Sequence, residues 1–201
     1  MNQSEASLIF KEELQKTGRR GVDQVIAGLE ELGFFTAPAS TRFHGNYPGG
    51  LVAHSVQVLI EATALRAAQV SLKGNLADSL PEDSVRIVAL LHDVCKAEVY
   101  HACERFRKDA EGKWEKYNSY TVDYSRLPLG HGEKSVVRLL KWGLELTDEE
   151  MVAIRWHMSG FDLSDAPEAR GNYGAAFEKT PLLALLIAAD LLASHILESN
   201  V

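Results

Sequence analysis

Several histidine and aspartate residues occupy positions where a helical chain would bury apolar side chains. Asp190 is the clearest case, because it is the only polar residue between Pro181 and Ala193. An ionised carboxylate on such a face is strongly destabilising unless a cation or hydrogen-bond donors compensate it. A metal ion, an arginine or the amides of a neighbouring helix would each meet that need, so Asp190 alone does not identify a site.

Four histidines raise the same question. His54 lies on an apolar helical face, and His92 is adjacent to Asp93 in the middle of an apolar segment. His131 opens a predicted helix and His157 ends another. Taken singly, each is more typical of a hydrogen-bonded core residue than of a ligand.

Taken together, five segments of the chain bring His or Asp toward an interior face. Imidazole and carboxylate are ligands for Fe, Mn and Zn, and metal sites in helical proteins form between such faces. Six ligands are too many for one catalytic ion with an open coordination position, and they suit two ions bridged by one carboxylate. The candidate metal ligands are His54, His92, Asp93, His131, His157 and Asp190.

The charge balance limits what else the chain binds. With 21 Lys+Arg against 28 Asp+Glu the formal net charge is −7, so we expect no broad nucleic-acid-binding surface, which would need excess cations. A small patch for one or two phosphates is still compatible with this balance. The N-terminus has no signal-peptide pattern, and the apolar run Pro181–Leu192 is too short to cross a bilayer. We therefore expect a cytoplasmic protein without a membrane partner.

Hydrophobic periodicity predicts a mostly helical chain, with loops at 33–50 and 159–179. Aromatic and β-branched residues in Val99–Val122, around a turn at 109–113, predict a β-hairpin. Capping boxes at Ser79–Glu82 and Thr147–Glu150 predict two helix starts. The predicted helices are Ser4–Lys16, Val22–Leu32, Leu51–Val70, 82–97, His131–Trp142, 148–158 and Pro181–Leu197.

The sequence thus predicts one all-α domain over residues 1–201. N-terminal helices occupy 1–42 and a metal-binding core occupies 43–198. The hairpin insert, 99–124, lies between the His92-Asp93 pair and the helix that begins at His131.

The order and context of the candidate ligands resemble the HD superfamily of metal-dependent phosphohydrolases in its binuclear form. The segment Asn46–His54 resembles the Gly-Gly-Leu-x-x-His start of the first ligand helix. Leu90–Lys96 resembles the HD-x-x-K helix, with Cys95 where Gly is usual. Leu-Gly-His131-Gly, Trp-His157 and Ala-Ala-Asp190 complete the set, and the match covers roughly residues 43–195. The resemblance implies an HD-domain helical bundle that carries the hairpin between the HD helix and the third ligand helix.

The resemblance also implies two divalent metal ions, drawn from Mn, Fe, Zn and Mg. One ion would be held by His54, His92, Asp93 and Asp190, and the other by Asp93, His131 and His157. The nearest pattern within the family is the HD domain of 3′→5′ exoribonucleases, whose loop is similar to residues 43–51 here. This chain has no OB-fold segment before the HD part, and it lacks the Gly-Tyr-Pro signature of cyclic-di-GMP phosphodiesterases.

The implied activity is hydrolysis of a phosphoester in a nucleotide or nucleic-acid-like substrate by a metal-activated hydroxide. Asp93 and Lys96 are the candidate catalytic residues. Lys96 follows Asp93 by three residues and would bind a substrate phosphate from the same side of the helix, although a surface lysine favourable to the helix dipole has the same spacing. The predicted partner is a small phosphorylated substrate, and the oligomeric state stays open. Further substrate contacts are expected from His44, Asn46, Tyr47 and Arg155.

Two other functions share parts of this pattern. A branch of the same superfamily, the mixed-valent di-iron oxygenases, uses the same ligand order and the same lysine. A non-catalytic binding module that keeps metals for stability is the third alternative, and the complete ligand set argues against it, because such a module has no need for open metal positions.

Overall fold

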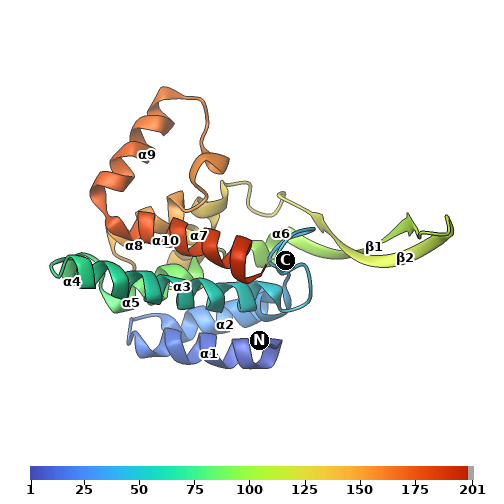
Figure 1. The fold of residues 1–201 in the computed structure, drawn as a ribbon, viewed down its shortest axis with the longest axis horizontal. Coiled ribbons are helices and arrows are strands. Elements are labelled where there is room, and N and C mark those ends of the chain that lie inside the picture. Colours follow the sequence, from blue (N-terminus) through green and yellow to red (C-terminus); the bar gives the residue numbers. More distant parts are fainter. Residues whose placement is uncertain (199–201) are drawn as a thin grey trace.

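The computed structural model describes residues 1–198 as a helical body from which a long β-hairpin projects (Figure 1). The mostly helical chain and the antiparallel hairpin confirm the expected class of fold. The helices are α1 Gln3–Lys16, α2 Val22–Leu32, α3 Gly50–Leu72, α4 Leu76–Ser79, α5 Glu82–Leu91, α6 Lys96–Val99, α7 His131–Lys141, α8 Asp148–Trp156, α9 Pro167–Lys179 and α10 Pro181–Leu192. Shorter turns of helix lie at Phe34–Thr36, Ser159–Asp162 and Ala193–Leu197, and the strands are β1 Tyr100–Lys108 and β2 Trp114–Val122.

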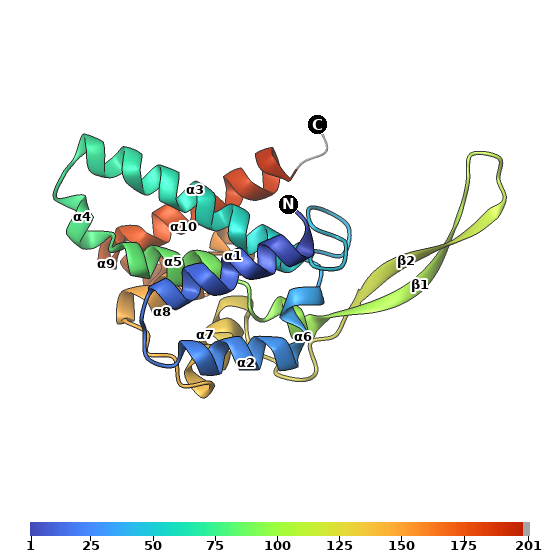
Figure 2. The same ribbon diagram turned by 90° about the horizontal axis from the view of Figure 1, so that it is seen from below.

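Helix α3 is the centre of the body. It packs against α1, α5 and α10, which surround it from different parts of the chain (Figure 2). Its first half is buried on every side, from Gly50 to Leu59 apart from Gln57. Buried apolar residues from α1 through α10 form one continuous cluster, whose removal from water is the main favourable term for the fold. A histidine on the first half of α3 is therefore held in a rigid environment.

Helix α5 begins at Glu82 without the predicted capping box, and it ends earlier than predicted. Ser79 caps nothing, because it is the last residue of α4, and Pro81 stands at the N-cap of α5 without a side-chain cap. Proline disfavours the helical region for the residue before it, so Leu80 is non-helical and α5 starts at Glu82. The helix ends at Leu91 rather than continuing to Ala97, and tight i→i+3 bonds follow, such as Lys96 N–H to Asp93 O at 3.0 Å.

The second predicted capping box is confirmed. Thr147 Oγ1 accepts from the backbone N–H of Glu150, and the Glu150 carboxylate accepts from the N–H of Thr147. Helix α8 then runs to Trp156, two residues short of the predicted end.

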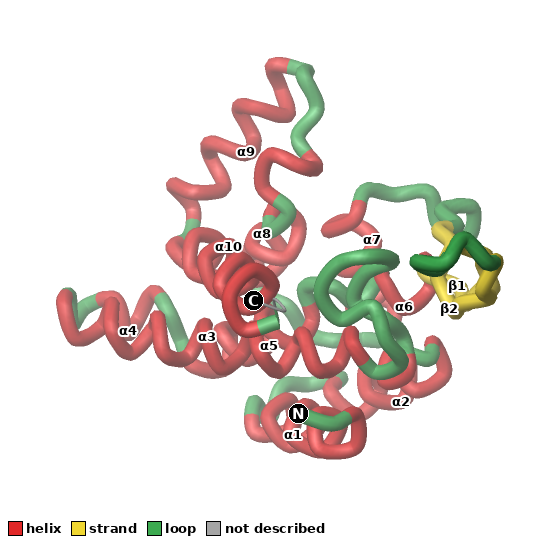
Figure 3. The backbone as a smooth tube through the Cα atoms, turned by 45° about the vertical axis from the view of Figure 1, so that its right-hand side comes forward, coloured by secondary structure: helices red, strands yellow, loops and turns green. Residues whose placement is uncertain are grey.

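The predicted loop at 159–179 is wrong in its second half, because α9 occupies Pro167–Lys179. Pro167 provides a favourable first helical position, and Gly171 and Gly174 each oppose the helix by only about 1 kcal/mol. Ala176 is buried and α9 packs on α8 and α10, which outweighs the two glycines. Figure 3 shows α9 standing away from the rest of the body.

The hairpin pairs Tyr100 with Val122 at its base and Lys108 with Trp114 near its tip. Asp109 closes the turn, since its carboxylate accepts from the backbone N–H groups of Glu111 and Lys113. Most residues of both strands are exposed, so the hairpin leaves the body without packing on it. Its base nevertheless follows directly after α6, beside the His92-Asp93 segment.

Within residues 1–198, no single helix combines the length and the apolar character needed to cross a membrane; only the bent pair Pro167–Lys179 and Pro181–Leu197 reaches those limits together.

Candidate metal centre

His54 is placed by a tight loop before α3. Gly49 has a φ of +83°, a conformation that side chains disfavour, and a Cβ on Gly50 would collide with the carbonyl of Gly45. The two glycines let the loop fold back against the start of α3. His54, in the second turn of that helix, is then buried at 1% exposure.

The His92-Asp93 pair lies where α5 ends. His92 is the C-cap of α5, and both side chains are buried. The tight turns after Leu91 carry the chain away, while the N–H of Cys95 donates to Ser135 Oγ of α7. This bond joins the end of α5 to the helix that supplies the next histidine.

His131 and His157 are brought together by the contact between α7 and α8. Gly132 permits this contact, because a Cβ there would collide with the Arg155 carbonyl. His131 is the first residue of α7 and His157 follows the last residue of α8. Their ring centroids lie 5.3 Å apart.

All four histidines point Nε2 at one carboxylate. The distances from Nε2 to the Asp93 oxygen that each ring faces are 3.7 Å for His54, 3.4 Å for His92, 2.5 Å for His131 and 3.3 Å for His157. His54 and His92 face Oδ2, whereas His131 and His157 face Oδ1. Asp93 thus stands between two pairs of imidazoles, one at each oxygen.

The opposite nitrogen of every ring has a partner of its own. His92 Nδ1 donates to Ala89 O at 2.9 Å, and His157 Nδ1 donates to Ile154 O at 2.7 Å. His54 Nδ1 lies 3.0 Å from Glu198 Oε1, and His131 Nδ1 lies 3.3 Å from Cys95 Sγ. An Nδ1 partner of this kind fixes the ring orientation. Where the partner accepts a hydrogen bond from Nδ1–H, the proton of the neutral ring stays on Nδ1 and Nε2 carries the lone pair.

Three of these Nε2 atoms are buried without a hydrogen-bond partner among the described residues: His54, His92 and His157. Buried polar groups in folded proteins nearly always have a hydrogen-bond partner. Three buried nitrogens without one, in one place, are the pattern expected of a ligand site. Ligand atoms from His54, His92 and Asp93 lie within 4.8 Å of one another, as do those from Asp93, His131 and His157. These two overlapping groups are compatible with a metal site.

Asp190 lies beside the cluster but is less central than expected. Its Oδ1 is 3.2 Å from His54 Nε2, and its side chain keeps 23% exposure, so it is half-buried rather than fully buried. It belongs to neither of these two groups, nor to a third close group, which His44, His54 and Glu198 form. Burial alone would raise the pKa of Asp190, but the close contact with the His54 ring and the charge of that ring lower it below its usual range.

Lys96 lies against the shared carboxylate, as the sequence predicts, although it stands on the separate helix α6. Its Nζ is 2.5 Å from Asp93 Oδ2. Burial would raise the pKa of Asp93, but the Lys96 ammonium and the surrounding imidazoles hold it well below its usual range. Burial in turn opposes the charge of Lys96, and Asp93 overcomes this and raises the lysine pKa.

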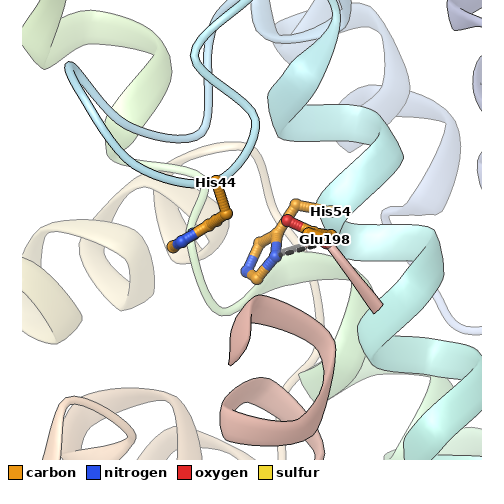
Figure 4. A group of neighbouring side chains, drawn as sticks. All are labelled: His44, His54 and Glu198. Carbon is orange, nitrogen blue, oxygen red and sulfur yellow. Dashed lines mark hydrogen bonds and ion pairs between the residues drawn. The ribbon is translucent and has the colours of Figure 1, made fainter. Parts of the chain in front are cut away.

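The C-terminal segment supplies a residue that the sequence did not single out. Glu198 points back at His54, and Figure 4 shows His44 on the other side of the same ring. Burial would lower the pKa of His54, but Asp190 and Glu198 raise it to about 9. A polar side chain six residues beyond the end of α10 has no motif or periodicity, so no sequence signal marked it.

The four predicted rim contacts separate into two groups. His44 lies 4.9 Å from His54, centroid to centroid, and burial lowers its pKa to about 4. Tyr47 is 49% exposed, near enough to Glu198 for its charge to help burial raise the tyrosine pKa. Asn46 is exposed, and Arg155 is paired with Glu133 and stacked on Trp156, so neither lines the cavity described next.

A cavity of about 440 Å³ opens beside the cluster, within the size range of small-molecule sites. It reaches both His131, a candidate metal ligand, and the base of the hairpin. Its polar and aromatic walls include His44, Lys96, Tyr100, Tyr124, His131 and Lys134. Lys134 was not predicted, although its position one turn after His131 placed it on the same helical face.

No protein-family model, no curated protein and no solved structure matches the chain. The site itself is therefore the basis on which a function is proposed.

Proposed function

We propose that this protein is a metal-dependent phosphohydrolase of the HD type, which cleaves a phosphoester of a small nucleotide-like substrate. The observation that carries the proposal is the set of four imidazoles whose Nε2 atoms converge on the two oxygens of Asp93. A cluster built for stability alone would not leave the Nε2 atoms of His54, His92 and His157 buried without a hydrogen-bond partner in the described chain.

The donor set fits metal ions. Three buried Nε2 atoms have no hydrogen-bond partner in the described chain, and an imidazole lone pair with a fixed Nδ1 is the usual metal donor. One ion would be held by His54, His92, Asp93 and Asp190, and a second by Asp93, His131 and His157. When bound, such ions supply positive charge that lowers the pKa of a water and polarises a phosphoryl oxygen.

The chain's own residues supply the remaining functions. Lys96 is anchored by Asp93 and lines the cavity, so its ammonium is placed to bind an equatorial phosphoryl oxygen. The burial of His92 and His157 excludes water from the rear of the cluster. Tyr100 and Tyr124 line the cavity on the side of the hairpin, where a flat base could stack.

Metal content and turnover test this proposal together. The protein is purified anaerobically, its metals are quantified, and it is assayed with Mn²⁺ against nucleotides and bis(p-nitrophenyl) phosphate. We expect phosphoester turnover in the wild type, its loss in Asp93→Asn, and full turnover in Asp23→Asn, an exposed aspartate on α2.

Two results would contradict the proposal. A near-stoichiometric di-iron centre with a mixed-valent spin signal and no turnover would favour the oxygenase alternative. Metal binding that only raises stability, with no turnover of any substrate in the panel and no mixed-valent signal, would favour the binding module.

A further inference from the structure

Lys134 is a buried cation with no counter-ion among the residues that the structure describes. It lies on α7, is 2% exposed, and lines the cavity beside the metal-ligand cluster. Within residues 1–198, no carboxylate lies within 4.0 Å of its Nζ, and no hydrogen bond to that atom is found. Removing an ammonium from water without a compensating partner costs free energy, so the burial of Lys134 requires an explanation.

The acidic residues near Lys134 are engaged elsewhere. Glu133, its neighbour on α7, pairs with Arg155. Asp123 is fully exposed, and its pKa is lowered chiefly by the backbone N–H of Ser125, with a smaller effect from the charge of Lys134. The aromatic ring of Tyr124 lies 5.9 Å from Nζ, at the outer limit of a cation–π contact.

Lys134 differs in this respect from other buried charges. Glu98 receives two hydrogen bonds from Arg138, and Glu150 receives two from Arg19. Lys96, the other cation in the cavity, is already balanced by Asp93. The free positive charge in this cavity is therefore that of Lys134.

We propose that Lys134 is a phosphate-binding residue, which holds a phosphate group of the substrate in the cavity beside the metal ligands. The identification of that phosphate as the substrate's depends on the proposed function. The anion site itself depends only on the buried, uncompensated ammonium and on the cavity that it faces.

Stability without a ligand gives the first test. Lys134→Met keeps most of the buried apolar stem and removes the charge, and Lys141→Met removes an exposed charge from the same helix as a control. In phosphate-free buffer we expect Lys134→Met to unfold at a higher temperature than the wild type, and Lys141→Met to be unchanged. A lower unfolding temperature, or failure to fold, would show that the ammonium is satisfied within the fold and would overturn the proposal.

Binding of inorganic phosphate and pyrophosphate gives the second test, by isothermal titration of protein freed of metal with a chelator. We expect Lys134→Met to bind roughly tenfold to a hundredfold more weakly than the wild type, as for the loss of one charge-assisted hydrogen bond. Lys141→Met should bind as the wild type does. Unchanged affinity in Lys134→Met, or no binding by the wild type, would overturn the proposal.

Turnover separates this inference from the proposed function. If the metal-loaded protein hydrolyses phosphoesters, inorganic phosphate should compete with the substrate, and stimulation by phosphate instead would overturn the assignment to a substrate group. If no turnover is found but phosphate binding still depends on Lys134, the proposed hydrolase fails while the anion site stands. Turnover with undiminished phosphate binding in Lys134→Met contradicts the inference alone.

Discussion

Two buried polar clusters in this protein are built in opposite ways. Around Glu150, each carboxylate oxygen accepts two hydrogen bonds. Oε1 accepts from Arg19 Nη2 at 2.8 Å and from Ser84 Oγ at 2.7 Å. Its Oε2 accepts from Arg19 Nη1 and from the N–H of Thr147, both at 2.9 Å. Around Asp93, by contrast, three of the four imidazoles present a buried Nε2 with no hydrogen-bond partner in the described chain.

The difference separates two reasons for burying polar groups. The Glu150 cluster joins the turn after α1 to α5 and α8, and it is complete without any ligand. The Asp93 cluster leaves three buried ring nitrogens without a hydrogen-bond partner in the described chain, as a cluster that binds a ligand would. Four variants test this comparison, in order of decreasing expected effect.

The largest effect is expected in the complete cluster. Glu150→Ala removes the carboxylate that accepts from the Ser84 hydroxyl and from the Arg19 guanidinium, which keeps only its hydrogen bond to Glu145 O. Breaking a buried ion pair in this way should lower the free energy of unfolding by about 3–5 kcal/mol. Urea denaturation measures it, and a loss below about 1 kcal/mol would show that the cluster is not structural.

The incomplete cluster should respond to metal rather than to mutation. In His157→Asn the amide can still donate to Ile154 O, so metal-free protein should lose less than about 1.5 kcal/mol of stability. The wild type with metal at a thousand times its Kd should gain about 4 kcal/mol, and the variant should lose most of that gain. His101→Asn, at an exposed hairpin position, is the control. A large loss of stability in the metal-free variant would show that His157 supports the fold itself rather than a metal ion.

Glu198 should have an intermediate effect, through the ring of His54 that it holds. Glu198→Ala is expected to weaken metal binding by roughly tenfold to a hundredfold, as removal of a ligand's hydrogen-bond partner generally does. Glu198→Gln, which keeps an acceptor, should weaken it less. The exposed Glu12→Gln should leave the affinity unchanged, and equal affinity in all three would exclude a positioning role for Glu198.

The smallest effect is expected at Ser84, which contributes one of several donors to Glu150. Ser84→Ala should lower the free energy of unfolding by about 1 kcal/mol, because Arg19 still satisfies the carboxylate. Thermal denaturation measures it. A loss as large as that of Glu150→Ala would mean that the cluster has no redundancy.

The sequence was informative where residue type and local periodicity decide the structure. The four histidines and Asp93 were anomalous on apolar faces, and the structure brings all five together. Helix α2 was predicted to the residue, and the hairpin to within a residue at its base. Local signals sufficed because each of these elements is specified by its own side chains.

The sequence was misleading where a distant contact decides the structure. Helix α9 contains two glycines and forms because α8 and α10 pack against it. Helix α5 ends at Leu91, and the segment after it is held by the hydrogen bond from the N–H of Cys95 to Ser135, forty residues later. No local sequence pattern predicts this contact. Glu198 and Lys134 were missed for the same reason, since their importance lies in what surrounds them after folding.

Metal content is the most direct test of the account, because the proposed metal ions would fill the incomplete cluster. Elemental analysis of anaerobically purified wild type, Asp93→Asn and Asp23→Asn, after reconstitution with Mn²⁺ or Fe²⁺, measures it. We predict close to two equivalents per chain in the wild type and in Asp23→Asn, and at most one in Asp93→Asn. Absence of bound metal in the wild type, under every reconstitution condition, would contradict the account.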